Sequence, residues 1–268
     1  MQMVTHADIV GDLHALGVRE GMVLLAHVSM SRIGRVVGGE QTVAEALLEA
    51  VGESGTLVMP AQSWQLCDPA YLADPGVSPA LWPMIRANLP VYDPAVTPTR
   101  TMGRTAELFR TMPGVLRSSH PHRSFAARGP LAERILAVHD LDDPVGERSP
   151  LGAIEAIGGW SLLIGVGYEK CTMLHLAEER SGTLRETARN GAPLMVEGRR
   201  RWVGFDERVV HDEDFPEVGR AFARETGRER SGPIGAAPSR LVPDAELVGF
   251  ASAWFRRHRT VSGKTDQV

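Results

Sequence analysis

The chain contains little cysteine, with only Cys67 and Cys171 among its 268 residues. Two cysteines cannot build a disulfide framework or a four-cysteine metal site, so the sequence does not belong to either of those classes. No apolar run approaches the roughly 18 residues that a membrane-spanning helix requires. The N-terminus lacks a basic stretch followed by an apolar core, the pattern of a secretory signal. We therefore expect a cytoplasmic protein that has no membrane partner.

Acidic residues slightly outnumber basic ones, with 33 Asp and Glu against 29 Lys and Arg. The formal net charge is −4, which gives no support for nucleic-acid binding, because that function favours a basic surface. The negative sign does suit a cationic partner. The sequence shows no internal repeat and no low-complexity linker. We therefore predict a single domain over residues 1–260, followed by a flexible C-terminal tail over residues 261–268.

Three continuous apolar runs predict buried strands, at residues 22–28, 56–60 and 161–166. Residues 42–51, between the first two runs, place apolar side chains at helical spacing. This order of strand, helix and strand is typical of a parallel crossover unit. Residues 193–205 predict a two-stranded hairpin. The sequence therefore predicts an α/β fold, a single α/β/α layered domain with a mainly parallel central sheet and an added β-hairpin.

Polar side chains gather where the third apolar run ends. Glu169, Thr172 and His175 follow that run within a single short segment. In open α/β sheets, ligands bind beyond the carboxyl ends of the strands. A carboxylate, a hydroxyl and an imidazole in this position suit proton-transfer chemistry, with His175 as a general base. The same spacing is compatible with Glu169 and Thr172 capping a helix on which His175 merely packs.

Two further kinds of site can be drawn from this region. Cys171 lies four residues before His175, so the two could form a thiolate–imidazole nucleophile, although a small buried cysteine is the commoner role. A metal site could combine His27, His120, His122 and His175, because zinc sites often join a tight pair of ligands to a distant one. The local sequence leaves both open.

Two loops carry hydrogen-bond donors that suit anionic oxygens. Residues 29–34 lie between a strand and a helix, so their backbone amides could meet a pyrophosphate, although they match no known phosphate-loop fingerprint. Residues 117–125 combine two arginines, three hydroxyls and two histidines, a set that could cradle phosphates. Residues 61–100 are irregular and rich in proline and aromatics, which is typical of a functional wall or lid.

Six segments of the chain form a pattern that is more specific than any one of them alone. They are residues 26–34, 55–60, 102–110, 117–129, 165–178 and 232–237. The most informative reads Gly165-Val-Gly-Tyr-Glu-Lys-Cys-Thr-Met-Leu-His-Leu-Ala-Glu. In this order and register, the segments resemble the aminoglycoside 3-N-acetyltransferase family, over nearly the whole chain.

This resemblance implies acetyl-CoA-dependent transfer to the 3-amino group of the 2-deoxystreptamine ring of aminoglycosides, which confers antibiotic resistance. It implies an α/β fold distinct from the GNAT fold of the smaller common N-acetyltransferases. It casts His175 as the general base, Glu169 as an orienting or charge-stabilising partner, and Thr172 as a donor to the developing oxyanion. The implied coenzyme-binding residues are His27, Val28, Ser29, Ser31, Arg32, Ile33, Gly34, Arg117, Ser119, His122, Ser124 and Phe125.

The chemistry of the acceptor adds a second set of candidates. Aminoglycoside amines are mostly protonated at neutral pH, so the acceptor cleft should carry carboxylates beside its aromatic walls. The candidate substrate-binding residues are Gln62, Trp64, Asp68, Tyr71, Asp93, Glu107, Glu178 and Asp206. We expect no metal cofactor, because a thioester is already activated and thiolate is a good leaving group.

Two positions depart from the family pattern. Val28 stands where a second small hydroxyl is expected, which predicts fewer coenzyme contacts there. Cys171 stands where asparagine is common, which argues against a cysteine nucleophile as a general part of the mechanism. The alternatives are a metal-dependent hydrolase using the four histidines, a covalent acyl-enzyme on Cys171, and a same-family acyltransferase for a non-antibiotic amine. The oligomeric state is open, a homodimer included.

Overall fold

Three parallel strands form the centre of a seven-stranded sheet in the computed structural model, which describes residues 3–259. They are β7 (Trp160–Ile164), β2 (Val23–Val28) and β4 (Thr56–Pro60), and β2 pairs with both neighbours. Nearly every side chain in these strands is buried, as expected when helices cover both faces of a sheet. Each of the three apolar runs in the sequence therefore overlaps a central strand, as predicted, although β7 begins one residue earlier and ends two residues earlier than its run.

The strands on either side of this centre pair antiparallel. The spatial order is β10-β11-β7-β2-β4-β6-β5. The flanking strands are β10 (Arg230–Ile234), β11 (Ala237–Pro243), β6 (Phe125–Arg128) and β5 (Leu116–Arg117). Within the described residues, β11 and β6 run against the other strands of the sheet, so the sheet is mixed but mainly parallel in direction. A separate parallel pair joins β1 (Met3–Val4) to β3 (Arg35–Val36).

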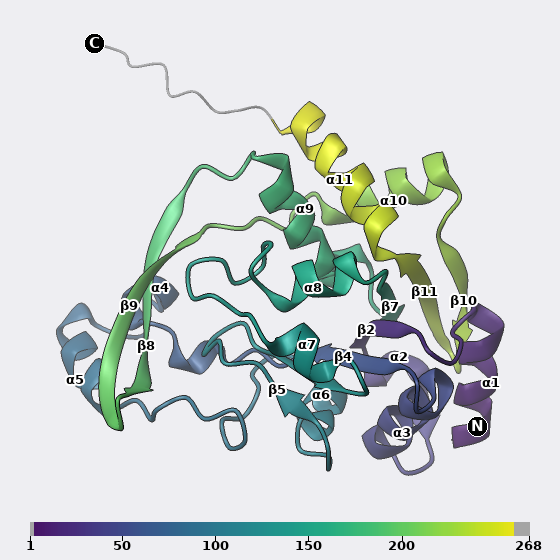
Figure 1. Ribbon diagram of the computed structural model, residues 1–268, viewed down its shortest axis with the longest axis horizontal. Coiled ribbons are helices and arrows are strands. Elements are labelled where there is room, and N and C mark those ends of the chain that lie inside the picture. The colour runs from purple at the N-terminus through teal and green to yellow at the C-terminus, as the bar shows by residue number, and fades with distance from the viewer. Residues whose placement is uncertain (1–2, 260–268) are drawn as a thin grey trace.

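Helices cover both faces of the sheet (Figure 1). One face carries α1 (His6–Leu16), α2 (Met30–Ile33), α3 (Glu40–Val51) and α6 (Arg104–Phe109). The other carries α7 (Ala132–Leu136), α8 (Pro150–Ala156), α9 (Met173–Ser181), α10 (Phe215–Thr226) and α11 (Asp244–His258). Successive strand residues alternate between the two cores, since Leu24 packs in one and Leu25 in the other. The fold is therefore layered α/β/α.

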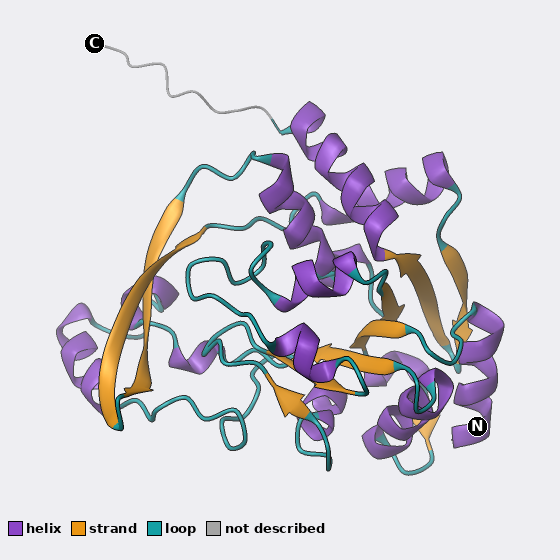
Figure 2. Ribbon diagram, viewed as in Figure 1, coloured by secondary structure: helices purple, strands orange, loops and turns teal. Residues whose placement is uncertain are grey.

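A long hairpin stands away from the main sheet, at the left of Figures 1 and 2. Its strands β8 (Thr187–Val196) and β9 (Arg199–Arg208) pair along their whole length, so the hairpin is longer than the predicted 193–205. Glu197 and Gly198 connect them with φ of 50° and 72°, the left-handed pair that a two-residue hairpin turn requires.

The stretch predicted to be irregular, residues 61–100, contains only short helices. They are η1 (Trp64–Leu66), α4 (Pro69–Leu72), η2 (Pro79–Leu81) and α5 (Trp82–Asn88), and a further short helix, η3 (Tyr168–Lys170), follows β7. Among residues 3–259, no helix combines the length and apolar character needed to traverse a bilayer. The tail predicted at 261–268 lies outside the described residues.

Candidate active site

A cavity of about 650 Å³ lies at the carboxyl ends of the three central strands. Residues His27 and Pro60 bring the ends of β2 and β4 to it, and Val166 follows β7. Further parts of its wall come from the loop after β2, from the segment that follows β4, and from the segment that leads into α6. Arg123, the loop leading into α9, and the start of α10 complete the wall. The topology therefore places the cavity where open α/β sheets bind their ligands.

His175 lies in the first turn of α9 and lines this cavity. Its Nδ1 is 2.6 Å from Oε2 of Glu178, one helical turn further along the same face. The Glu178 side chain is fully buried and that of His175 is 16% exposed, and the imidazole packs against the Phe215 ring with centroids 4.9 Å apart. A carboxylate can only accept here, so Nδ1 donates and Nε2 keeps the lone pair that a general base needs.

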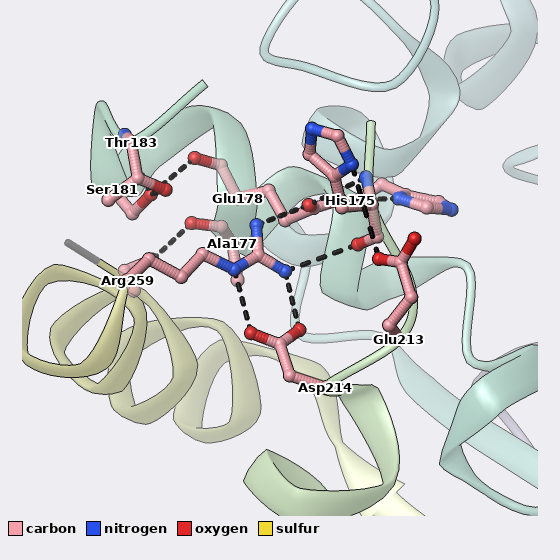
Figure 3. Close-up of polar contacts among 10 residues, drawn as sticks. His175, Ala177, Glu178, Ser181, Thr183, Glu213, Asp214 and Arg259 are labelled. Carbon is pink, nitrogen blue, oxygen red and sulfur yellow. Dashed lines mark hydrogen bonds and ion pairs between the residues drawn. The ribbon is translucent and has the colours of Figure 1, made fainter. Parts of the chain in front are cut away.

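Glu178 accepts hydrogen bonds on both of its carboxylate oxygens (Figure 3). Oε1 accepts from Nη1 of Arg259 at 2.5 Å and from the backbone N–H of His211 at 3.0 Å. Buried carboxylates are stable only when they are paired in this way. The carboxylate is therefore held with one oxygen on the imidazole and the other on a cation.

Glu169 and Thr172 both line the cavity, but the side chain of neither residue hydrogen-bonds the His175 ring. The exposed Glu169 accepts from the backbone N–H of Gly167 at 2.9 Å and so caps its own turn. Thr172 occupies the N-cap position of α9, and its side chain makes no capping hydrogen bond. The carboxylate that meets the histidine is therefore Glu178 and not Glu169, the partner that the family resemblance implied.

Burial sets the protonation of two other side chains at the cavity. It lowers the pKa of His27 to about 4, and the neighbouring His175 acts in the same direction. Nε2 of His27 is buried and has no hydrogen-bond partner among the described residues. Burial also raises the pKa of the Cys171 thiol to about 12, and the Asp244 carboxylate adds to that effect. Cys171 is therefore a thiol at neutral pH, which does not suit a nucleophile.

Some of the predicted coenzyme-binding residues line the cavity. These are His27, Val28, Ser29 and Ser31. The others lie outside its lining: Arg32, Ile33, Gly34, Arg117, Ser119, His122, Ser124 and Phe125. Residues 27–31 of the 27–34 segment therefore line the cavity, and residues 32–34 do not.

Arg117 illustrates why the second coenzyme loop lies apart. Its guanidinium donates to the backbone carbonyls of Thr97 and Ala61 and to Oγ of Ser63 at 2.6 Å. The side chain therefore fastens the 61–100 stretch to the sheet instead of facing a ligand. From the 117–125 segment, the cavity is lined by Arg123.

All five of the predicted acceptor-binding carboxylates are also absent from the cavity lining. Gln62 and Trp64 line it, whereas these residues do not: Asp68, Tyr71, Asp93, Glu107, Glu178 and Asp206. Asp68 and Glu107 form ion pairs with Arg86 and Arg110 at 2.8 and 2.5 Å. These two carboxylates therefore connect local segments of the chain. The carboxylates of the lining are Glu169 and Asp212, within residues 3–259.

Three cationic side chains of the lining were not among the predicted residues: Arg104, Arg123 and Lys170. Arg104 belongs to the 102–110 segment, one of the six that resemble the family, so the sequence could have indicated it as a site residue. Arg123 is an ion-pair partner of Glu207 at 3.2 Å, and its guanidinium lies 4.7 Å from the centroid of the Trp64 ring. No local pattern predicts that pairing, because β9 supplies Glu207 from far along the chain.

The four histidines considered as metal ligands are divided between two places. His27 and His175 line the cavity, while His120 and His122 are fully buried against the Phe205 ring. Within residues 3–259, no group of three or more histidine, cysteine or acidic side chains is placed to hold a metal ion. The arrangement on which a metal-dependent hydrolase would rely is therefore not formed.

Fold and site together define a layered α/β enzyme with a histidine–carboxylate pair in a cavity at the sheet's carboxyl edge. Residues 25–256 match the family model described as aminoglycoside 3-N-acetyltransferase. The chain belongs to this family.

Individual relatives agree over nearly the whole chain. The chain is 42% identical to an aminoglycoside N(3')-acetyltransferase-like protein, YokD of Bacillus subtilis, over 94% of this chain and 92% of that protein. The YokD crystal structure superposes with a TM-score of 0.93, covering 96% and 95% of the two chains. Identity to aminoglycoside N(3)-acetyltransferase VIII of Streptomyces fradiae is 38%, over 94% and 91%. A binary complex of AAC-IIIb with CoASH superposes with a TM-score of 0.85 at 31% identity, over 96% and 97%.

Proposed function

We propose that this protein transfers the acetyl group of acetyl-CoA to the 3-amino group of the 2-deoxystreptamine ring of aminoglycosides, and thereby confers resistance to them. The observation that carries the proposal is the 2.6 Å contact between His175 and Glu178 at the cavity. Family membership and the CoASH complex of a relative support the same reaction.

Within this proposal, His175 is the general base. The Nδ1–H donated to Glu178 fixes the ring orientation and leaves Nε2 to take the proton of the attacking amine. The buried carboxylate then stabilises the imidazolium that forms. Thr172, which lines the cavity with an uncommitted side chain at the start of α9, is the candidate donor to the developing oxyanion.

The cavity lining also suits the acetyl donor, acetyl-CoA, whose thioester supplies an already activated acetyl group. Lys170 and the exposed Arg104 give positive charge for phosphates. The buried and unpartnered Nε2 of His27 provides a hydrogen-bonding atom for the pantetheine chain or the acetyl carbonyl. Ser29 and Ser31 add hydroxyls on the same wall.

A second candidate is a same-family acyltransferase for a non-antibiotic amine. One observation favours it: within the described residues, the cavity lining has two carboxylates, Glu169 and Asp212. An aminoglycoside carries several ammonium groups, and two carboxylates can pair with only a few of them. An amine of lower charge would need fewer partners.

Release of free thiol from acetyl-CoA tests the two candidates in one panel. With a 2-deoxystreptamine aminoglycoside, we expect steady release and a product acetylated at the 3-amino group, identified by mass spectrometry and NMR. His175→Ala should abolish the release and spare coenzyme binding, because the base acts only on the acceptor. Near-normal turnover of that variant would overturn the mechanism. Release with simple amines alone would favour the second candidate.

The proposal extends to the organisation of the protein. The match of one family model to residues 25–256 supports a single domain over residues 1–260, and a fold distinct from the GNAT fold. A cytoplasmic location accords with the acetyl donor. Sedimentation of the purified protein decides between a monomer and a homodimer.

A further inference from the structure

Arg259, which follows α11, reaches the catalytic pair from a position 81 residues away from Glu178 in the sequence. Figure 3 shows its guanidinium between Glu178 on one side and Asp214 on the other. The contact to Glu178 is made on Oε1, the oxygen that does not face His175. Arg259 therefore meets the base through the carboxylate and makes no hydrogen bond with the imidazole.

The guanidinium is fixed on its other edges as well. Its Nε and Nη2 donate to the two carboxylate oxygens of Asp214 at 2.8 and 2.5 Å, a bidentate arrangement. Nη2 also donates to the backbone carbonyl of His211 at 3.2 Å. The cation lies 4.0 Å from the centroid of the Phe255 ring. A group held on so many sides keeps one orientation and does not sample many rotamers.

The geometry gives this cation a defined electrostatic effect. A fully buried carboxylate that met only a neutral imidazole would have no full charge opposite its own. Arg259 supplies that opposite charge on Oε1 and leaves Oε2 to accept from Nδ1 of His175. The ring orientation of His175 therefore depends on a carboxylate that Arg259 holds in place.

Other charged groups face His175 from several elements. The cavity that it lines is shared with His27 from β2, Glu169 and Lys170 from η3, and Asp212 from the segment before α10. Glu178 belongs to its own helix, while Arg259 and its partner Asp214 come from α11 and the α10 N-cap. Of these, Arg259 is the cation that hydrogen-bonds the orienting carboxylate.

We propose that Arg259 is a positioning residue of the base, acting through Glu178 to fix the ring of His175. The inference rests on the proposed role of His175 in acetyl transfer. Arg259 follows α11 and is not part of the cavity lining, so the lining alone does not reveal this role.

The test compares Arg259→Gln and Arg259→Lys with Arg257→Gln, an exposed change near the end of the same helix. The nitrogen NMR signals of the His175 ring need no substrate, so they report on Arg259 even if the acetyl transfer itself proves wrong. Loss of the cation should replace the single Nδ1–H tautomer of the neutral ring by a mixture of both tautomers, because Glu178 is then no longer held against Nδ1. Arg259→Lys should restore most of the wild-type tautomer, and Arg257→Gln should leave it unchanged.

Turnover gives a second readout. Arg259→Gln should lower kcat by about 10²-fold, since a misplaced base loses rate steeply, while KM for acetyl-CoA changes little. The loss of kcat across the variants should follow the loss of the Nδ1–H tautomer seen by NMR. An unchanged tautomer in folded Arg259→Gln overturns the inference whatever the activity. A wild-type protein without thiol release, or an active His175→Ala variant, instead overturns the proposed function.

Discussion

The guanidinium of Arg123 and the carboxylate of Glu207 form an ion pair at 3.2 Å in which neither side chain is more than 5% exposed. Glu207 lies on β9 and also accepts from the side-chain amide of Asn190 on β8 at 2.8 Å. Arg123 covers the Trp64 ring at the cavity. The pair therefore joins the hairpin, which stands outside the main sheet, to a wall of the site.

Removing one member of this pair should be costly, because the other charge stays buried without a partner. Arg123→Met should lower the free energy of unfolding by about 3–5 kcal/mol, measured by urea denaturation. The matched control is Arg189→Met, whose ion pair with Asp206 on the same hairpin is exposed by 66% and 60%. Its removal should change stability by at most about 1 kcal/mol. Equal effects of the two variants would contradict the structural role of Arg123.

The two carboxylates near the base should differ sharply in their effect on turnover. Glu178→Gln presents an amide that can donate to Nδ1, which favours the wrong tautomer, so kcat should fall by roughly 10²–10⁴-fold. Glu169→Gln should change kcat only several-fold, because Glu169 caps its own turn at Gly167. Thiol-release kinetics with both variants provide the measurement. A larger loss for Glu169→Gln would reverse the assignment of the two residues.

Cys171 should be dispensable for catalysis. Burial raises the pKa of its thiol to about 12, and the same holds for Cys67 elsewhere in the core. Neither should be alkylated by iodoacetamide in the folded protein at pH 8, as read by mass spectrometry against a denatured control. Cys171→Ala should keep turnover within a few-fold of the wild type. Rapid labelling of Cys171 alone, with loss of activity, would revive a covalent acyl-enzyme.

Asp244 should make stability depend on pH. Burial raises its pKa to about 7, and one oxygen accepts from Oγ of Ser161 at 2.6 Å. Because the folded pKa lies above the unfolded value of 3.8, the folded state holds its proton more tightly, and stability is lost as pH rises from about 4 to about 7.

The variant Asp244→Asn cannot lose that proton. Its stability relative to the wild type should therefore improve between pH 4 and pH 7, by up to about 4 kcal/mol at the usual 1.36 kcal/mol per pKa unit. Urea denaturation of both proteins at the two pH values measures the difference. Asp12→Asn, at a part-buried position on another helix, controls for the substitution itself. A constant difference at both pH values would mean that Asp244 titrates normally.

Periodicity in the sequence predicted the central elements well. The apolar runs that overlap β2, β4 and β7 and the helical spacing of α3 are strong local signals, and they locate the carboxyl edge at which the cavity lies. The flanking strands β6 and β11 were not predicted. The first begins at the end of the 117–125 loop, and the second follows a turn at Gly235. Edge strands are short and depend on their neighbours for pairing.

The partners of the site residues could not be predicted to the same extent. Asp68 and Glu107 were reasonable candidates for an acidic cleft, but Arg86 and Arg110 pair with them, and only the folded chain shows those contacts. The three-residue spacing of His175 and Glu178 was visible in the sequence, whereas the preference for Glu178 over Glu169 depends on where η3 ends. Arg259 carries no local signal at all, because its partner lies in another helix.

The docking of α11 beside α9, visible in Figure 1, has a consequence for protein synthesis. The ribosome completes α9, with its histidine and glutamate, well before it reaches Arg259. A nascent chain that has folded only as far as the hairpin therefore contains the base without the cation that arranges it. On the role proposed for Arg259, the base is fully arranged only after α11 has been made, so activity appears late in translation.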